Sequence, residues 1–68
     1  MDSIKNYEIL LEGIINEKWF LTLENLSVEI NRAGNTKVSG AFDQSALYSL
    51  FKKIRDLGVV LISVRLKE

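Results

Sequence analysis

Three side chains of the segment 43–58 have the types and spacing needed to hold an anion. Tyr48, Lys52 and Arg55 fall on one face if the segment is helical, and Asp56 follows directly after them. A small-molecule or nucleotide sensing domain that uses this face is therefore one hypothesis. The competing interpretation is that lysine and arginine on an exposed helix face are simply solvated.

Asp56 is the least expected of these residues. A carboxylate in the last turn of a helix faces the negative end of the helix dipole, and this repulsion destabilises the helix by about 0.3 kcal/mol or more. An ion pair with Lys52 one turn back, or with Arg65 in the last predicted strand, is the simplest compensation. Recognition of a partner by Arg55 and Asp56 together is the alternative.

Other chemistry has little support in the sequence. The chain contains neither Cys nor His, which excludes disulfides, thiolate nucleophiles and zinc sites of the usual ligand set. Glu8 and Glu12 stand four positions apart in a predicted strand, about 13 Å by rise alone, too far for a glycosidase pair. No nucleophile is paired with a base. We therefore predict that the protein is not an enzyme and holds no cofactor or metal.

Length and charge narrow the remaining classes. The 68 residues predict a single domain, 1–68, with residues 1–5 frayed, and such a small core gains stability from self-association. Nine basic and nine acidic residues give a net charge of zero, which argues against nucleic acid as a partner. No apolar run approaches the roughly 20 residues that span a bilayer, so we expect no membrane partner and a cytoplasmic protein.

The first half of the chain predicts a strand, a short helix and a hairpin. Alternation predicts a strand up to Ile15, in which Gly13 marks a bulge or a close backbone approach. Asn16 is a candidate cap for a helix of one to two turns that buries Trp19, Phe20 and Leu23 and ends at Asn25. Strict alternation over 26–31 and 36–42, joined by the turn residues of RAGN, predicts the hairpin.

The second half predicts a helix and a final strand. Asp43 is a good N-cap and Gly58 a good stop, and between them the apolar residues form a single stripe: Leu47, Leu50, Phe51, Ile54 and Leu57. The residues from Val59 onward are β-branched and extended. The order of elements predicts an α+β, ferredoxin-like split βαβ fold, with a four-stranded antiparallel sheet and helices on one face.

The densest pattern in the chain lies in DQSALYSLFKKIRDLGVVLISVR. With YEILLEGIINEKW and LSVEI it resembles a family of small, uncharacterised bacterial and archaeal single-domain proteins with a DQxAL…IRDLG…LxSV signature. The resemblance implies a compact domain and no particular activity. The matching residues are Trp19, Asp43, Gln44, Ala46, Leu47, Ile54, Arg55, Asp56, Leu57, Gly58, Ser63 and Val64. Tyr48 and Ser49 stand where many relatives are expected to have His and Gly.

The leading functional hypothesis is a non-enzymatic interaction or regulatory module. We predict that it acts as a homo-oligomer, most simply a dimer, or docks on another protein, through the open face of the sheet or the edge of the last strand. The predicted surface has an apolar centre and a charged rim. Its residues are Leu10, Ile14, Val59, Leu61 and Arg65.

Overall fold

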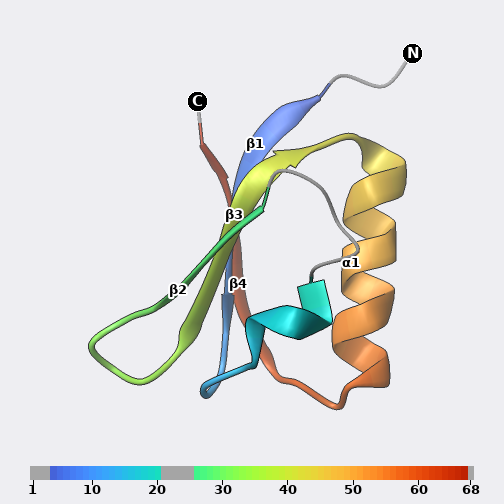
Figure 1. Ribbon diagram of the computed structural model, residues 1–68. Coiled ribbons are helices and arrows are strands. Elements are labelled where there is room, and N and C mark those ends of the chain that lie inside the picture. The colour runs from blue at the N-terminus through green and yellow to red at the C-terminus, as the bar shows by residue number, and fades with distance from the viewer. Residues whose placement is uncertain (1–3, 21–25, 68) are drawn as a thin grey trace.

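The structure is a computed structural model that describes residues 4–20 and 26–67 (Figure 1). Its elements follow one another as β1 (Lys5–Leu11), the 3₁₀ turn η1 (Glu17–Phe20), β2 (Leu26–Ile30), β3 (Thr36–Phe42), α1 (Gln44–Asp56) and β4 (Leu61–Lys67). Within the described residues this is an α+β fold with one sheet and one α-helix. The fraying expected for the first residues lies mostly outside the described part, and β1 begins at Lys5.

The four strands form one antiparallel sheet in the order β2-β3-β1-β4. The two central strands are β1 and β3, and the two edges are β2 and β4. Helix α1 lies on one face of this sheet and packs mainly over β3 (Figure 1). The pairing of β1 with β4 shifts by a bulge between Leu10 and Leu11, which decides which side chains of β4 share a face.

The hydrophobic core lies between α1 and the central strands. Its buried members come from β1, η1, β3 and α1, and they are Ile9, Leu11, Phe20, Val38, Phe42, Leu50 and Ile54. Leu47 and Phe51 are half-buried and pack against this cluster. The apolar stripe predicted for the helix therefore faces the sheet as expected.

Helix α1 begins and ends where its sequence predicts. The Asp43 carboxylate accepts a hydrogen bond of 2.8 Å from the Ala46 N–H, which satisfies one of the free donors of the first turn. Gly58 has a φ of +72°, a conformation that favours glycine, and its N–H donates to the Arg55 carbonyl at 3.1 Å. Both ends of the helix are thus fixed locally.

The predicted hairpin is confirmed, with β2 and β3 in antiparallel register. Its connection is organised by Asn31, whose side-chain oxygen accepts hydrogen bonds of 3.0 Å from the N–H groups of Ala33 and Asn35. Gly34 adopts a φ of +80° within this connection. The sequence prediction identified the turn residues after Asn31 and missed the role of Asn31 itself.

The first predicted strand is too long, because β1 ends at Leu11 and not at Ile15. The chain turns at Gly13, which has a φ of +84° with open space where a Cβ would lie, so the expected close approach is wrong. Beyond Leu11, hydrogen bonds from the side chain of buried Thr36 take the place of backbone pairing between strands. Its Oγ1 donates to the Gly13 carbonyl and accepts from the Ile15 N–H, both at 2.8 Å. These bonds hold the loop after β1 against β3.

The predicted first helix is only the single turn η1 in the described residues. Asn16 begins it as predicted, because its side-chain oxygen accepts a hydrogen bond of 3.0 Å from the Lys18 N–H. Phe20 enters the core, but Trp19 is 43% exposed, so its predicted burial is wrong. Three residues per turn separate adjacent side chains widely, so one aromatic ring points inward and the other outward. Leu23 and Asn25 lie outside the described residues.

Candidate functional site

The sheet face opposite α1 is polar and ion-paired. The Lys37 ammonium lies 3.9 Å from a Glu8 carboxylate oxygen and 3.5 Å from one of Glu29. The Lys67 ammonium lies 3.5 Å from Glu8. Glu8 on β1 is thus paired with lysines of both neighbouring strands, β3 and β4. Glu8 and Lys37 are half-buried while Glu29 and Lys67 are exposed, and ion pairs near the surface contribute about 0–1 kcal/mol each.

The structure does not bring the five residues of the predicted interaction surface together. Leu10 and Arg65 lie on the polar face, since Leu10 pairs with Ser63 and Arg65 with Glu8. Val59 packs against the core on the helix side. Leu61 pairs with Leu11, whose side chain is buried under the helix, because the bulge shifts the register between Leu61 and Ser63. Simple alternation along the sequence had placed Leu61 on the same side as Arg65.

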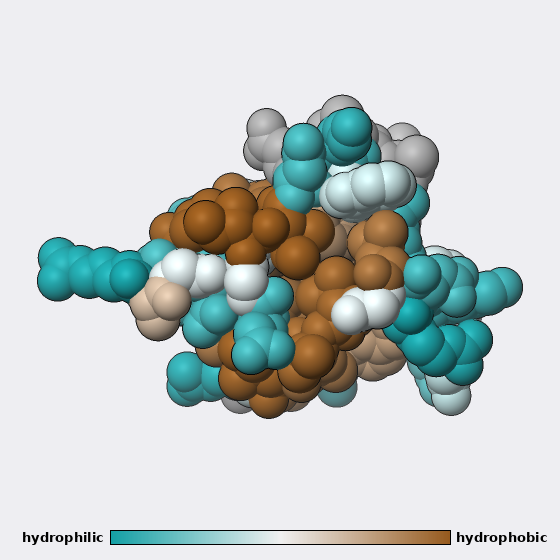
Figure 2. Space-filling model, turned by 90° about the horizontal axis from the view of Figure 1, so that it is seen from below, coloured by the Kyte–Doolittle hydropathy of each residue, from teal (hydrophilic) through white to brown (hydrophobic). Residues whose placement is uncertain are grey.

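Ile14, the fifth of these residues, lies in the loop after β1 and is 72% exposed. This loop is held to the chain that leads into β4, because the Glu12 N–H donates to the Val60 carbonyl at 2.9 Å. Val60 and Leu61 are also exposed at this end of the molecule. Figure 2 views that end and shows apolar surface gathered there, hollowed in the middle. Ile14 and Leu61 thus belong to an apolar end of the sheet and not to its open face.

A row of uncovered apolar side chains follows β4 on the same side of the sheet as α1. Val64 pairs with Ile9 and Leu66 with Tyr7, which places them on the helix side, and Ile62 precedes them in the alternation. Their exposed fractions are 47% for Ile62, 39% for Val64 and 46% for Leu66. Since β4 is an edge strand, the backbone groups on its outer side are also free of sheet partners among the described strands.

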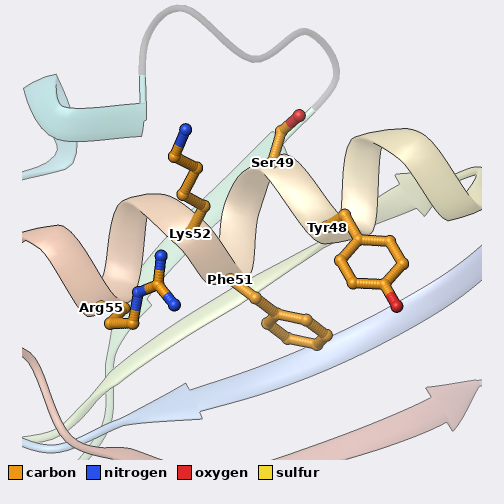
Figure 3. Close-up of a pocket in the computed structure, with 5 residues that line it drawn as sticks. All are labelled: Tyr48, Ser49, Phe51, Lys52 and Arg55. Carbon is orange, nitrogen blue, oxygen red and sulfur yellow. The ribbon is translucent and has the colours of Figure 1, made fainter.

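One flank of α1 carries aromatic residues toward this row. In Figure 3 the rings of Tyr48 and Phe51 project toward the part of the sheet formed by β1 and β4, while the side chains of Ser49 and Lys52 point away from it. Phe51 is half-buried and Tyr48 is 69% exposed. We call the surface formed by Tyr48 and Phe51 of α1 with Ile62, Val64 and Leu66 of β4 the α1–β4 margin.

The residues of the predicted anion face surround a shallow hollow on α1. The hollow has a volume of about 460 Å³ and is lined by Tyr48, Ser49, Phe51, Lys52 and Arg55 (Figure 3). A second hollow of about 380 Å³ adjoins it, lined by Gln44, Leu47, Tyr48 and Phe51. Tyr48, Lys52 and Arg55 therefore do meet around one depression, whose remaining wall is the aromatic flank of the helix.

Comparison with protein families matches residues 6–65 of this chain, from β1 into β4, to one family. The chain belongs to the family described as Domain of unknown function (DUF8691). The match contains every strand and helix described above, at least in part, so the fold unit and the family unit coincide. Comparison with curated proteins and with solved structures found no match. The sequence resemblance to a family of uncharacterised small domains is confirmed at this level.

In this DUF8691 domain, the ion pair predicted for Asp56 is absent. Asp56 is exposed, and the ion pairs between residues 4–20 and 26–67 do not include it, so the predicted partners Lys52 and Arg65 do not reach it. Lys53 and Arg55 in the same turn supply positive charge to the negative end of the helix. Asp56 also lies outside the lining of the α1 hollow.

Two further findings concern the described part of the DUF8691 domain. No three of its His, Cys, Asp and Glu side chains lie close enough together to hold a metal ion. Among its helices, none has the length and apolar character that crossing a membrane requires.

The residues of the α1–β4 margin on β4 were missed in the sequence, although a signal for them was present. From Ile62 to Lys67 the chain alternates strictly, with Ile62, Val64 and Leu66 against Ser63, Arg65 and Lys67. This pattern assigns the apolar set to the helix side. It does not show that the helix leaves that set uncovered, because the lateral position of α1 over the sheet depends on packing.

Proposed function

We propose that this DUF8691 domain is a non-enzymatic protein-interaction module whose contact surface is the α1–β4 margin. The observation that carries the proposal is the exposure of three aliphatic side chains, Ile62, Val64 and Leu66, on the sheet face that α1 otherwise seals. Covering a fully exposed aliphatic side chain is worth about 1.5–3 kcal/mol, so three half-exposed ones offer a partner a useful gain.

The free edge of β4 supports the same proposal. An edge strand presents unpaired N–H and C=O groups, which another extended segment can satisfy by adding a strand to the sheet. In the α1–β4 margin this backbone edge lies beside the apolar row. A strand added there receives affinity from its main chain and selectivity from the side chains that meet Phe51 and Val64.

A ferredoxin-like topology with a shortened first helix would explain why no helix covers the α1–β4 margin in the described residues. We infer that the domain is a split βαβ unit in which η1 stands in place of a full first helix. The strand order β2-β3-β1-β4, with antiparallel neighbours, and the position of α1 between β3 and β4 in the chain support this inference. With no long helix beside it in the described residues, α1 packs over β3 near the centre of the sheet, away from β4.

A regulatory or docking role also suits the side chains available. The chain has neither His nor Cys, two of the side chains that enzymes use most for proton transfer and nucleophilic attack. The aromatic and aliphatic character of the margin resembles the core of a protein–protein contact. The charged side chains Glu8, Lys37 and Lys67 pair with one another on the opposite face.

The proposal can be tested with a pair of matched variants. Ile62 on β4 and Ile30 on β2 are both isoleucines on the helix side of an edge strand, and both are 47% exposed. Peptides selected from a phage-displayed random library on the unmodified domain are expected to bind Ile30→Lys and to lose binding to Ile62→Lys. Peptides that bind all three proteins equally would contradict the α1–β4 margin as the contact surface.

A second candidate function is favoured by the hollow on α1. We propose as the alternative that an anion with an aromatic part, such as a nucleotide, binds where Tyr48, Lys52 and Arg55 meet. Calorimetric titration with ATP and with inorganic pyrophosphate tests it, with the double variant Lys52→Ala and Arg55→Ala as the control. Binding that the double variant abolishes supports the candidate. No binding at millimolar ligand, or equal binding by both proteins, contradicts it.

A further inference from the structure

We infer that the partner of the α1–β4 margin is a second copy of this chain, joined by antiparallel pairing of the two β4 strands about a two-fold axis at Val64. The inference rests on the proposed function and names its partner. It follows from the order of residues within β4, from the charges on that strand and from the difference between the two edges of the sheet.

The sequence of β4 is complementary to itself in this register. With Val64 opposite the partner's Val64, Ile62 meets the partner's Leu66 and Leu66 meets the partner's Ile62. Residues directly opposite in a sheet share a face, so the apolar rows of the two copies form one continuous strip on the helix side. The pairing uses the regularly alternating part of β4, from Ile62 to Leu66.

The charges of β4 select the same register. About Val64, Arg65 lies opposite the partner's Ser63 on the polar face, so no arginine directly faces another. Moving the axis to Arg65 would set each Arg65 against its own copy, which is destabilising. Moving it to Ser63 would pair Lys67 with Val59, beyond the start of β4. Lys67 is also already 3.5 Å from the Glu8 carboxylate of its own chain.

The other edge of the sheet does not offer the same surface. Within the described residues, β2 spans five residues, Leu26–Ile30, and β4 spans seven, Leu61–Lys67. Its helix-side residues Leu26 and Val28 are half-buried and pack against the core of their own chain. Ile30 is its exposed large apolar residue. The geometry therefore favours β4 over β2 as the strand that recruits a second copy.

The proposed dimer is a continuous sheet with both helices on one side. The two-fold axis runs perpendicular to the sheet, because antiparallel pairing about it keeps each face on its own side.

Cysteine cross-linking tests the register, because the natural chain has no cysteine. In the proposed dimer the two Val64 residues lie directly opposite, with Cα atoms about 4.5–5.5 Å apart, within the range for a disulfide. The two Ile62 residues are four positions out of register and lie roughly 14 Å apart. Oxidised Val64→Cys is expected to become a covalent dimer at least tenfold faster than Ile62→Cys, with an unchanged circular dichroism spectrum.

The solution mass of the domain is also measured by light scattering, to show whether it is a monomer or a dimer. Each combination of mass and cross-linking either supports or contradicts the inference. A dimer that cross-links through Val64→Cys supports the inference. A dimer that cross-links equally or better through Ile62→Cys overturns this register, and a monomer at every concentration overturns the second copy as partner. Neither of these two results contradicts the proposed function, which the peptide selection with Ile62→Lys and Ile30→Lys tests separately.

Discussion

Ile9 and Val64 lie directly opposite each other on neighbouring strands and on the same face of the sheet, yet Ile9 is fully buried and Val64 is 39% exposed. Both are β-branched aliphatic residues. What differs is the cover above them, because Ile9 on a central strand belongs to the core and Val64 on the edge strand β4 lies outside it. Burial in this small domain is therefore set by where its single described helix rests, and not by residue type alone.

The uncovered strip is also one-sided. On the β2 side, Leu26 and Val28 pack against the core, which Phe20 of η1 also joins. On the β4 side, Ile62, Val64 and Leu66 belong neither to the core nor to the half-buried residues packed against it. An asymmetry of this kind leaves the apolar row of β4 available for contact, while Leu26 and Val28 of β2 are already packed against the core.

The largest expected effect comes from the sealed centre. Leu50→Ala removes a fully buried side chain of α1 and leaves a cavity over the sheet. We expect a loss of roughly 2–5 kcal/mol in the free energy of unfolding, enough to unfold a marginal domain. Urea denaturation followed by circular dichroism measures it. A loss well below about 1 kcal/mol, the net contribution of a typical hydrogen bond, would show that α1 does not seal the core.

The next largest effect is expected in the loop after β1, which Thr36 holds against β3. Thr36→Val keeps the shape of a buried side chain but removes the hydroxyl that binds Gly13 and Ile15. Leaving those half-buried backbone groups without a partner is expected to cost about 1–3 kcal/mol. Hydrogen exchange should show faster exchange at the Ile15 amide. Unchanged protection at Ile15 would count against the described anchoring of this loop.

A smaller effect is expected at the start of the helix that provides the cover. Asp43→Ala removes the acceptor of the Ala46 N–H and should destabilise the domain by about 1 kcal/mol. Asp43→Asn retains a capping oxygen and serves as the control, with a loss of only a few tenths (about 0.3 kcal/mol). Equal losses in thermal unfolding of the two variants would contradict a capping role.

The smallest effect is expected at the margin itself. Leu66→Ala truncates a side chain that is 46% exposed and lies outside the core, so at the lowest practicable protein concentration the loss should be under about 1 kcal/mol. At high concentration the loss should grow, because the same side chain also contributes to the contact with a second copy. A loss as large as that of Leu50→Ala at low concentration would mean that Leu66 is part of the monomer core.

Much of the fold follows from local patterns in the sequence. The hairpin, the Asp43 cap, the Gly58 stop and the stripe through Leu50 and Ile54 are all local signals, and the structure agrees with each. The end of β1 was not predictable in this way, because it depends on bonds from Asn35 and Thr36, more than twenty residues away.

The candidate site was less predictable than the fold. Its anion face followed from helical spacing, and Tyr48, Lys52 and Arg55 do share a hollow. Alternation placed Leu61 on the same side as Arg65, but one bulge between Leu10 and Leu11 reverses the facing of Leu61 relative to Arg65. A bulge arises from the pairing of two strands, so the sequence of either strand alone does not predict it.

Solution mass over a range of concentrations, measured for three proteins, tests the α1–β4 margin most directly. We predict a dimer for the unmodified domain and for Ile30→Lys, and a monomer for Ile62→Lys with the same circular dichroism spectrum. The two variants change the same residue type at the same exposed fraction, 47%, on opposite edges of one sheet. A monomeric unmodified domain, or an Ile62→Lys variant that remains dimeric, would contradict the pairing of two copies through this margin.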